Sequence, residues 1–326
     1  MDLDYDELAQ SLSMTEIVRL QSALSLALRQ RFERKLAVAF SDIVESTRYF
    51  AKFGDEAGRH LQQRHLDLLQ QALDGAGRIA NTAGDGALLA FPTVDAAVAS
   101  LIRFLRLNSA DNTGRERDRQ LAVRIGVHYG SVLTDDVQIT GDSVNLCSRV
   151  TASATPGEIR LTRDAFYACS DTGFRTKCRP IAPVKVKGID APVAMFVLDW
   201  RDRSVFPASV QLETGEELPL PEQDIITFGR LRDLEGEPAN DIVLRCGDET
   251  HTKRISRWHF ELRRRENGFV LRTLSNAATE VNGQRVAKDE ECPIRPGDSV
   301  RVSDVLLLRF SPPPAEADGA TLFVKV

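Results

Sequence analysis

The chain has 326 residues, a net charge of −5 and 42% hydrophobic residues, a length that suits about two domains. Its apolar content excludes a disordered chain, and its acidic balance argues against nucleic-acid binding, which relies on Lys and Arg. Five cysteines without a CxxC pair indicate neither a disulfide framework nor a structural zinc site. The acidic first residues are unlike a signal peptide and no apolar run is long enough to span a membrane, so we expect a cytoplasmic protein without a membrane partner.

The first 200 residues alternate between helical and strand patterns. A capping box at Ser13–Glu16 starts a helix within an N-terminal helical segment, residues 1–35. The elements expected after it are strand 36–40, helix 55–76, strands 78–82 and 87–91, helix 94–105, surface loop 108–120 and strand 121–128. This β-α-β-β-α-β order is typical of a ferredoxin-like sheet, so the predicted fold class is α+β.

The pattern changes after Trp200. Helical periodicity disappears, and short strand-like runs recur between Gly, Pro and Asn turns, which predicts an all-β sandwich. We therefore expect one domain at 36–200, a second at 208–311 and a flexible tail at 312–326.

Two aspartates are expected to converge at one edge of the first sheet. Asp42 ends one strand and Asp85 lies in the turn before another, and a ferredoxin-like sheet makes these strands antiparallel neighbours. Paired carboxylates, completed by phosphate oxygens, suit the octahedral oxygen coordination of Mg²⁺. Each aspartate alone also fits an ordinary turn, where Asp is common.

A second polar pair lies on a predicted helix that begins at Gly141. Asn145 and Arg149 are four residues apart and share one helix face. An amide and a guanidinium on that face can stabilise charge that develops on a phosphoryl group. The same spacing also fits a solvated helix surface.

Six segments together resemble the catalytic domain of class III nucleotidyl cyclases. In the family's order over residues 36–198 they are AFSDIVESTRYF, NTAGDGALLAF, VRIGVHYGSV, ITGDSVNLCSRV, PGEIRLT and VKVKGIDAPVAMFVL. The resemblance implies conversion of ATP or GTP to the 3′,5′-cyclic monophosphate and pyrophosphate. It also implies two divalent cations, Mg²⁺ or Mn²⁺, and a homodimer with its sites at the subunit interface.

The resemblance gives the metal site three residues. Asp42 and Asp85 match the family's metal-binding aspartates, and the carbonyl of Ile43 is expected to be a further ligand. One ion is expected to activate the ribose 3′-hydroxyl and the other to bind the triphosphate.

Three further residues are assigned by the same resemblance. Asn145 matches the amide that orients the ribose, Arg149 the arginine that stabilises the transition state, and Lys187 a lysine that contacts the terminal phosphates. In the family these residues reach toward the aspartates of the other subunit. A lone protomer is therefore expected to be inactive.

The base pocket departs from the adenylyl pattern. This chain has Asn81 where adenylyl members usually carry lysine, and Gln138 where they usually carry aspartate or threonine. Each amide holds a donor and an acceptor, so rotation can serve adenine or guanine and base selection is expected to be loose. We expect ATP because adenylyl members predominate in the family. The alternatives are a guanylyl cyclase and a degenerate, cyclase-like scaffold that binds phosphoproteins.

Short motifs in the second half carry groups that bind phosphate, since arginine can donate two N–H bonds to it and a serine hydroxyl one. In order, FGR at 228–230, NDIVL at 240–244, ISRWH at 255–259 and VNG at 281–283 resemble the forkhead-associated (FHA) domain. The resemblance covers about 208–311 and implies a β-sandwich whose loops bind phosphothreonine-containing proteins or peptides.

On that resemblance, Arg230 and Ser256 hold the phosphate, Arg257 assists, and His259 braces the loop from inside. The family usually has an Asn-Gly pair before Thr279, where this chain has two alanines.

Asn276, displaced by one residue, is the candidate contact to the peptide backbone. A purely structural or dimerising sandwich is the alternative. Thr321 in the tail, once phosphorylated, is a candidate ligand for the chain's own FHA domain, and the alternative is a terminal strand that packs Leu322 and Val324.

Overall fold

The computed structural model describes residues 10–188, 191–213, 215–265 and 267–313. It divides into two compact units. The first comprises residues up to Phe104 and from Leu121 to Leu198, and the second comprises Leu105–Gln120 and the residues from Asp199 onward. The expected domain limits remain predictions, and the grouping of residues 105–120 with the C-terminal unit was not anticipated. Thr321 lies outside the described residues.

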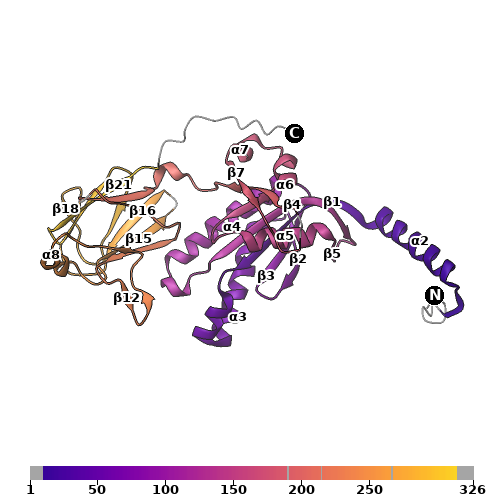
Figure 1. Cartoon of the computed structure of the whole chain (residues 1–326), viewed down its shortest axis with the longest axis horizontal. Coiled ribbons are helices and arrows are strands. Elements are labelled where there is room, and N and C mark those ends of the chain that lie inside the picture. The colour runs from indigo at the N-terminus through magenta and orange to yellow at the C-terminus, as the bar shows by residue number, and fades with distance from the viewer. Residues whose placement is uncertain (1–9, 189–190, 214, 266, 314–326) are drawn as a thin grey trace. The chain divides into compact units, whose positions relative to one another are not determined.

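The first unit has the predicted βαββαβ order. After helix α2 (Met14–Phe32) it contains β1 (Glu33–Ile43), α3 (Ser46–Leu73), β2 (Arg78–Ala83), β3 (Gly86–Phe91), the start of α4 (Val94–Thr113) and β4 (Val123–Thr134). It continues with β5 (Ile139–Thr140), α5 (Asp142–Ser153), β6 (Ile159–Thr162), α6 (Arg163–Ala168), α7 (Thr172–Arg175), β7 (Cys178–Val184) and β8 (Val193–Leu198). The main strands lie in the order β2-β3-β1-β4-β6-β8-β7, and β5 pairs with β4. The α+β fold class is thus confirmed (Figure 1).

Helix α2 begins at the predicted capping box. The Ser13 side chain accepts a hydrogen bond from the backbone N–H of Glu16, and the Glu16 carboxylate accepts one from the N–H of Ser13. This reciprocal pairing satisfies two of the N–H groups that a helix start leaves without a partner.

Two helices differ from the expectation. Helix α3 begins nine residues earlier than Asp55, and its two parts meet at Gly54, whose φ of +84° interrupts the helical geometry. Helix α4 runs on to Thr113, so the first half of the expected loop at 108–120 is helical. Polar residues there lack the apolar spacing of a core helix, and the side chain of Thr113 bonds back to the carbonyl of Ser109.

The side chains of β1 alternate between the two faces of the sheet. Val38 packs in one apolar cluster with Leu88 and with Cys147 of α5. On the other face, Ser41 bonds to His65 of α3. Because side chains alternate along a strand, Asp42 points to the same face as Val38, the one that α5 covers.

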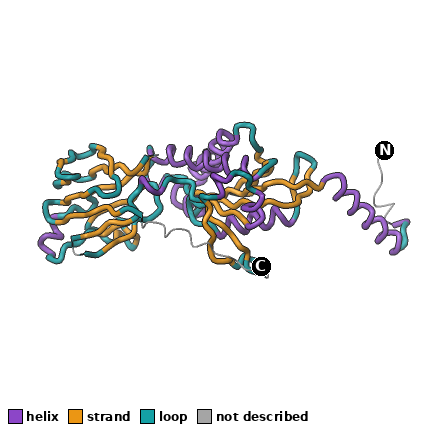
Figure 2. Tube along the Cα trace, turned by 90° about the horizontal axis from the view of Figure 1, so that it is seen from above, coloured by secondary structure: helices purple, strands orange, loops and turns teal. Residues whose placement is uncertain are grey.

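The second unit is a sandwich of two sheets. One has the order β10-β9-β21-β20-β17-β18 and the other β14-β11-β15-β16-β19. The strands are β9 (Ser209–Leu212), β10 (Glu217–Pro219), β11 (Ile225–Gly229), β12 (Asp233–Leu234), β13 (Glu237–Pro238), β14 (Ile242–Val243), β15 (Phe260–Arg265), β16 (Gly268–Thr273), β17 (Thr279–Val281), β18 (Gln284–Arg285), β19 (Glu291–Ile294), β20 (Ser299–Val302) and β21 (Leu306–Ser311), with the short helix α8 (Glu249–Arg254). Figure 2 shows the contrast between this strand-rich unit and the helices around the first sheet.

Aromatic side chains fill the core of the sandwich. Phe228 stacks on Phe260 with ring centroids 4.4 Å apart, and Phe310 meets Phe228 edge-on at 6.3 Å. All three are fully buried. Burial of rings of this size supplies much of the driving force for the fold and fixes the ends of β11 and β15, from which the phosphate-binding candidates extend.

In the described part of the chain, no helix is long and apolar enough to cross a membrane.

Candidate active site and phosphate-binding site

The two aspartates meet at one edge of the first sheet. Asp42 is in register with Gly86 across the antiparallel pair of β1 and β3, so it lies beside Asp85 in the preceding turn. The Asp85 carboxylate is close enough to raise the pKa of the Asp42 carboxyl by its charge. The juxtaposition that the strand order predicts is therefore present, although it assigns no role by itself.

Arg124 neutralises this edge from the next strand. It stands directly opposite Asp42 in the pairing of β1 with β4, and its guanidinium donates two bonds of 2.6 and 2.9 Å to one carboxylate oxygen. Its remaining terminal nitrogen donates to the carbonyl of Ala152 at 3.2 Å. The sequence reasoning missed Arg124. The register of β1 against β4 would have identified it, because cross-strand partners lie about 5 Å apart.

Burial sets the protonation of Asp42. Partial burial raises the pKa of its carboxyl above the usual range, the hydrogen bonds from Arg124 oppose that rise, and the neighbouring charge of Asp85 adds to it. A metal cation at this edge would favour the ionised form of Asp42, because it would offset both burial and the neighbouring charge of Asp85.

Helix α3 holds the aspartates in place. The hydroxyl of Ser46, at the start of the helix, donates to the carboxylate of Asp85. Further along, the ring of His65 and the hydroxyl of Ser41 are 2.8 Å apart and buried. Burial lowers the pKa of His65 to about 4, so the ring is neutral at pH 7. Both strand ends are thus tied to one helix.

The donors at this edge fit a hard divalent cation. Two carboxylates and nearby backbone carbonyls, including that of Ile43, are the oxygen ligands that Mg²⁺ and Mn²⁺ accept. Among the described residues, no group of three or more His, Cys, Asp or Glu side chains could hold a metal ion. A cation here would therefore need oxygens from the backbone, water or a phosphorylated substrate to complete its shell.

The two candidate base-contact residues flank one apolar cluster. Ala80, next to Asn81, and Ile139, next to Gln138, pack against the same buried residues as Val144 of helix α5. Asn81 and Gln138 are both exposed. The structure therefore brings their segments together and leaves both amides accessible to a ligand.

Arg78 of β2 makes a second link between these segments. Its guanidinium donates to the carbonyl of Val137 at 3.3 Å.

The candidate transition-state residues form a second group. Asn145 is exposed on α5, and Arg149, one turn later, donates to the carbonyl of Gly188 at 3.1 Å. Lys187, adjacent to that carbonyl, is exposed. The partner of the Arg149 guanidinium is thus the loop that carries Lys187, whereas the partner of Asp42 is Arg124.

In the second unit, backbone bonds assemble the candidate phosphate loops. The N–H of Arg230 donates to the carbonyl of Ser256 at 3.1 Å. Gly229 allows this approach, because a Cβ there would lie 2.1 Å from the carbonyl oxygen of Arg257. Asn240 adds a clamp, since its amide nitrogen donates to the carbonyls of Leu231 and Arg257, both at 2.8 Å.

His259 supports these loops from within. The N–H of Ser256 donates to Nδ1 of the ring at 3.3 Å, and Nε2 lies 3.0 Å from the hydroxyl of Thr279. Burial lowers the pKa of His259 to about 4, so the ring is neutral at pH 7. Because Nδ1 accepts, Nε2 must carry the proton and donate to Thr279. The predicted bracing of the Ser256 loop is present.

The side chains of the candidate phosphate site differ in exposure. Arg257 and Asn276 are exposed, and Ser256 is half-buried. The Nε of Arg230 is buried without a hydrogen-bond partner in the described structure. An unpaired buried guanidinium N–H is costly, and an anion at this point would satisfy it.

These two sites define a protein that joins a nucleotidyl cyclase fold to an FHA sandwich. The model for the adenylate and guanylate cyclase catalytic domain matches residues 29–199, and the chain belongs to that family. The model for the FHA domain matches residues 226–303, so the chain carries that domain as well.

Curated relatives resemble the chain over part of their length. A Rhizobium meliloti (strain 1021) protein whose name describes an adenylate cyclase is 26% identical over 218 residues, which are 64% of this chain and 36% of that protein. The adenylate cyclase of Streptomyces coelicolor is 29% identical over 135 residues, 41% of this chain and 34% of that one. The chain thus spans little more than a third of the length of these relatives.

Among solved structures, the adenylyl cyclase CyaB from P. aeruginosa matches 51% of this chain and 94% of its own, with 24% identity and a TM-score of 0.43.

Proposed function

We propose that the chain is a nucleotidyl cyclase that converts ATP to the 3′,5′-cyclic monophosphate and pyrophosphate. The observation that carries the proposal is the carboxylate pair of Asp42 and Asp85 at the edge of a family-typical sheet, with Arg124 beside it. In the reaction, the ribose 3′-oxygen attacks the α-phosphorus, the bond to the β-phosphate oxygen breaks, and the hydroxyl proton is released.

Divalent cations held by Asp42, Asp85 and the carbonyl of Ile43 would supply Lewis-acid activation of the hydroxyl and would neutralise the triphosphate. Displacement of Arg124 from Asp42 would free its guanidinium for phosphate oxygens, which it can bind through two parallel bonds. Ser46 and the helix behind it would keep Asp85 oriented while this exchange of partners takes place.

A complete site is proposed to need two subunits. Arg149 and the Lys187 loop are bonded to each other, and they form a group separate from the bonded pair of Asp42 and Arg124. In a homodimer, each aspartate pair would receive Asn145, Arg149 and Lys187 from the partner. The guanidinium and ammonium would stabilise charge on the leaving pyrophosphate, and the amide would orient the ribose.

Base selection is proposed to be loose, with ATP preferred and GTP as the alternative. Asn81 and Gln138 are exposed amides on neighbouring segments, and each can present a donor or an acceptor by rotation. A fixed charged partner would discriminate more strongly, because an unpaired buried polar group costs about 1 to 3 kcal/mol.

The FHA domain is proposed to dock phosphothreonine-containing proteins. The buried, unpaired Nε of Arg230 and the fixed loop of Ser256 support an anion site, with Arg257 at its exposed side. Asn276 remains the candidate contact to the peptide backbone.

Turnover of ATP and GTP by the full chain, with Mg²⁺ or Mn²⁺, tests the catalytic proposal. Cyclic product from ATP in excess of that from GTP is expected, and Asp42→Ala serves as the blank. A wild-type rate no higher than that of the blank would instead support a non-catalytic scaffold that binds phosphoproteins.

A further inference from the structure

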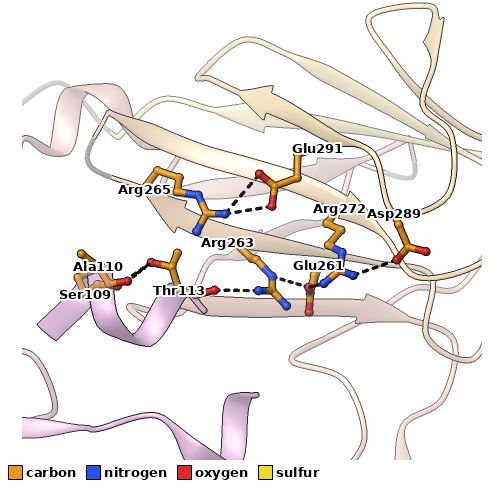
Figure 3. A network of polar contacts seen from close by, with 9 residues as sticks. All are labelled: Ser109, Ala110, Thr113, Glu261, Arg263, Arg265, Arg272, Asp289 and Glu291. Atoms are coloured by element: carbon orange, nitrogen blue, oxygen red, sulfur yellow. Dashed lines mark hydrogen bonds and ion pairs between the residues drawn. The ribbon is translucent and has the colours of Figure 1, made fainter. Parts of the chain in front are cut away.

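The second compact unit contains a segment from the middle of the cyclase sequence, residues 105–120. Figure 3 shows Ser109, Ala110 and Thr113 of this segment beside Arg263 of the FHA sheet. There Arg263 of β15 donates to the carbonyl of Thr113, the last residue of α4, at 2.8 Å. A cationic side chain at a helix C-terminus satisfies a carbonyl that the helix leaves free and complements its dipole.

This contact is largely withdrawn from water. The side chains of Arg263 and its ion-pair partner Glu261 are 12% and 9% exposed. The distance between Nε of Arg263 and Oε1 of Glu261 is 2.6 Å. Arg265, on the same strand, instead pairs with Glu291 of the sandwich at 3.0 Å. The Arg263 side chain is thus largely covered, whereas the Arg265 side chain stays 34% exposed.

Asp224 makes a second anchor for the segment. Its two carboxylate oxygens accept bonds from the hydroxyl of Ser109 at 3.3 Å and from the amide of Asn112 at 3.4 Å. Arg201 pairs with the same carboxylate at 3.1 Å. The polar residues that made 108–120 resemble a surface loop are therefore the ones that bind the sandwich.

Arg117 makes the third and shortest anchor. Its guanidinium donates two bonds, of 2.6 and 2.9 Å, to the two carboxylate oxygens of Asp241. Asp241 is nearly buried and also accepts from the backbone N–H and the hydroxyl of Thr227, both at 2.8 Å. A bidentate pair with one buried partner is stronger than an ordinary surface ion pair.

The third anchor is one residue from the phosphate loops. Asn240, next to Asp241, donates to two backbone carbonyls. One belongs to Leu231, which follows Arg230, and the other belongs to Arg257, itself a phosphate-binding candidate. At its other end the segment continues helix α4, where Val98 and Leu101 are buried in the first unit. One continuous helix therefore belongs to both units.

We infer that residues 105–120 are an intrachain ligand of the FHA sandwich, through which that domain acts on helix α4 of the cyclase. The part that concerns catalysis rests on the proposed function. A change at the phosphate loops alters the anchor at Asp241, and the anchor alters the end of a helix whose beginning is packed in the catalytic unit. Such coupling is reciprocal in free energy.

Arg117→Glu in the full chain tests this inference, with Arg265→Glu as the matched control. Both substitutions remove an arginine from a carboxylate ion pair and change the charge equally, but only Arg117 pairs with Asp241. We expect amide hydrogen exchange in residues 105–120 to rise roughly fivefold or more in Arg117→Glu alone, a size suited to one strong ion pair. Cyclase turnover should change by about threefold or more, in either direction, against the control. Arg117→Gln should give smaller changes of the same kind.

Equal exchange in Arg117→Glu and its control would overturn the docking. Faster exchange with equal turnover would overturn the action on the cyclase. A wild-type chain that makes no cyclic product would contradict the proposed function instead, and exchange across residues 94–104 would then decide whether the anchor acts on α4.

Discussion

The two candidate sites differ in how their charged groups are satisfied. At the edge of the cyclase sheet, Asp42 is already paired with Arg124, and Asp85 is held by Ser46. In the FHA domain, the Nε of Arg230 is buried without a hydrogen-bond partner among the described residues, and the loops around it are fixed by backbone and amide bonds. A ligand at the cyclase edge would therefore have to displace an internal partner, whereas a ligand at the proposed phosphate site would not. Preorganisation of the second site lowers the cost of binding, because fewer groups lose freedom.

The largest expected effect is a loss of turnover when the charge of Asp42 is removed. Asp42→Asn removes one charge from the proposed cation site, and turnover should fall roughly 10²- to 10³-fold, as when a principal electrostatic contact is lost. Cyclic product is measured at saturating Mn²⁺. Asp74→Asn, which alters only a surface pair with Arg103, is the control. Turnover within threefold of wild type would exclude Asp42 from the site.

Loss of the Arg230 side chain should weaken the binding of phosphothreonine peptides. Arg230→Ala removes the proposed phosphate donor, and affinity for a library-selected phosphothreonine peptide should fall about thirtyfold or more. Isothermal titration of the full chain with the peptide, in the absence of nucleotide, measures the affinity. Arg232→Ala, at a largely exposed position in the same loop, is the matched control. Equal affinities in the two variants would place the phosphate elsewhere.

Protonation of His259 at acid pH should destabilise the FHA domain. Burial lowers the pKa of His259 from 6.5 to about 4, so the unfolded chain binds more protons than the folded one between these values. The free energy of unfolding of the FHA transition should thus fall by roughly 3 kcal/mol as pH falls from 6.5 to 4. Urea unfolding at several pH values measures it. His65 adds a similar dependence in the cyclase transition.

His259→Gln isolates the contribution of this one ring. The variant should be less stable at pH 7 and should show a flatter pH dependence in the FHA transition only. A pH dependence as steep as that of wild type would assign the effect to other groups.

The smallest expected effect is a weaker Mn²⁺ affinity when the Ser46 hydroxyl is removed. Ser46→Ala removes the hydroxyl that holds Asp85, and Mn²⁺ affinity in the presence of nucleotide should weaken about three- to tenfold, the size of the net contribution of one ordinary hydrogen bond. Direct metal titration measures this without turnover. Ser22→Ala, on exposed helix α2, is the control. Unchanged metal affinity would make Ser46 a structural residue only.

The sequence predicted features that depend on element order. The meeting of Asp42 with Asp85 follows from two neighbouring strands and a hairpin, and the capped start of α2 follows from Ser13 and Glu16. These patterns are local or are fixed by the βαββαβ order. The other candidate site residues were assigned from the family motifs, and their roles stay predictions.

Features that depend on register or on distant pairing escaped the sequence. Arg124 meets Asp42 because of the exact alignment of β1 with β4, which hydrophobic runs leave undetermined. The partners of residues 105–120 lie more than 100 positions later in the chain, for example Asp224 and Asp241. A polar segment that binds a distant sheet has the same composition as a solvated loop.

Mixing two inactive variants tests the shared site most directly. Asp42→Ala lacks the proposed cation ligand and Arg149→Ala the proposed transition-state group, so each alone should lose at least about 10²-fold in turnover. If the site is shared between subunits, a mixed dimer restores one intact site, and cyclic product should reappear at up to about half the wild-type rate per dimer. No recovery, despite heterodimers detected by mass spectrometry, would contradict a site built from both subunits.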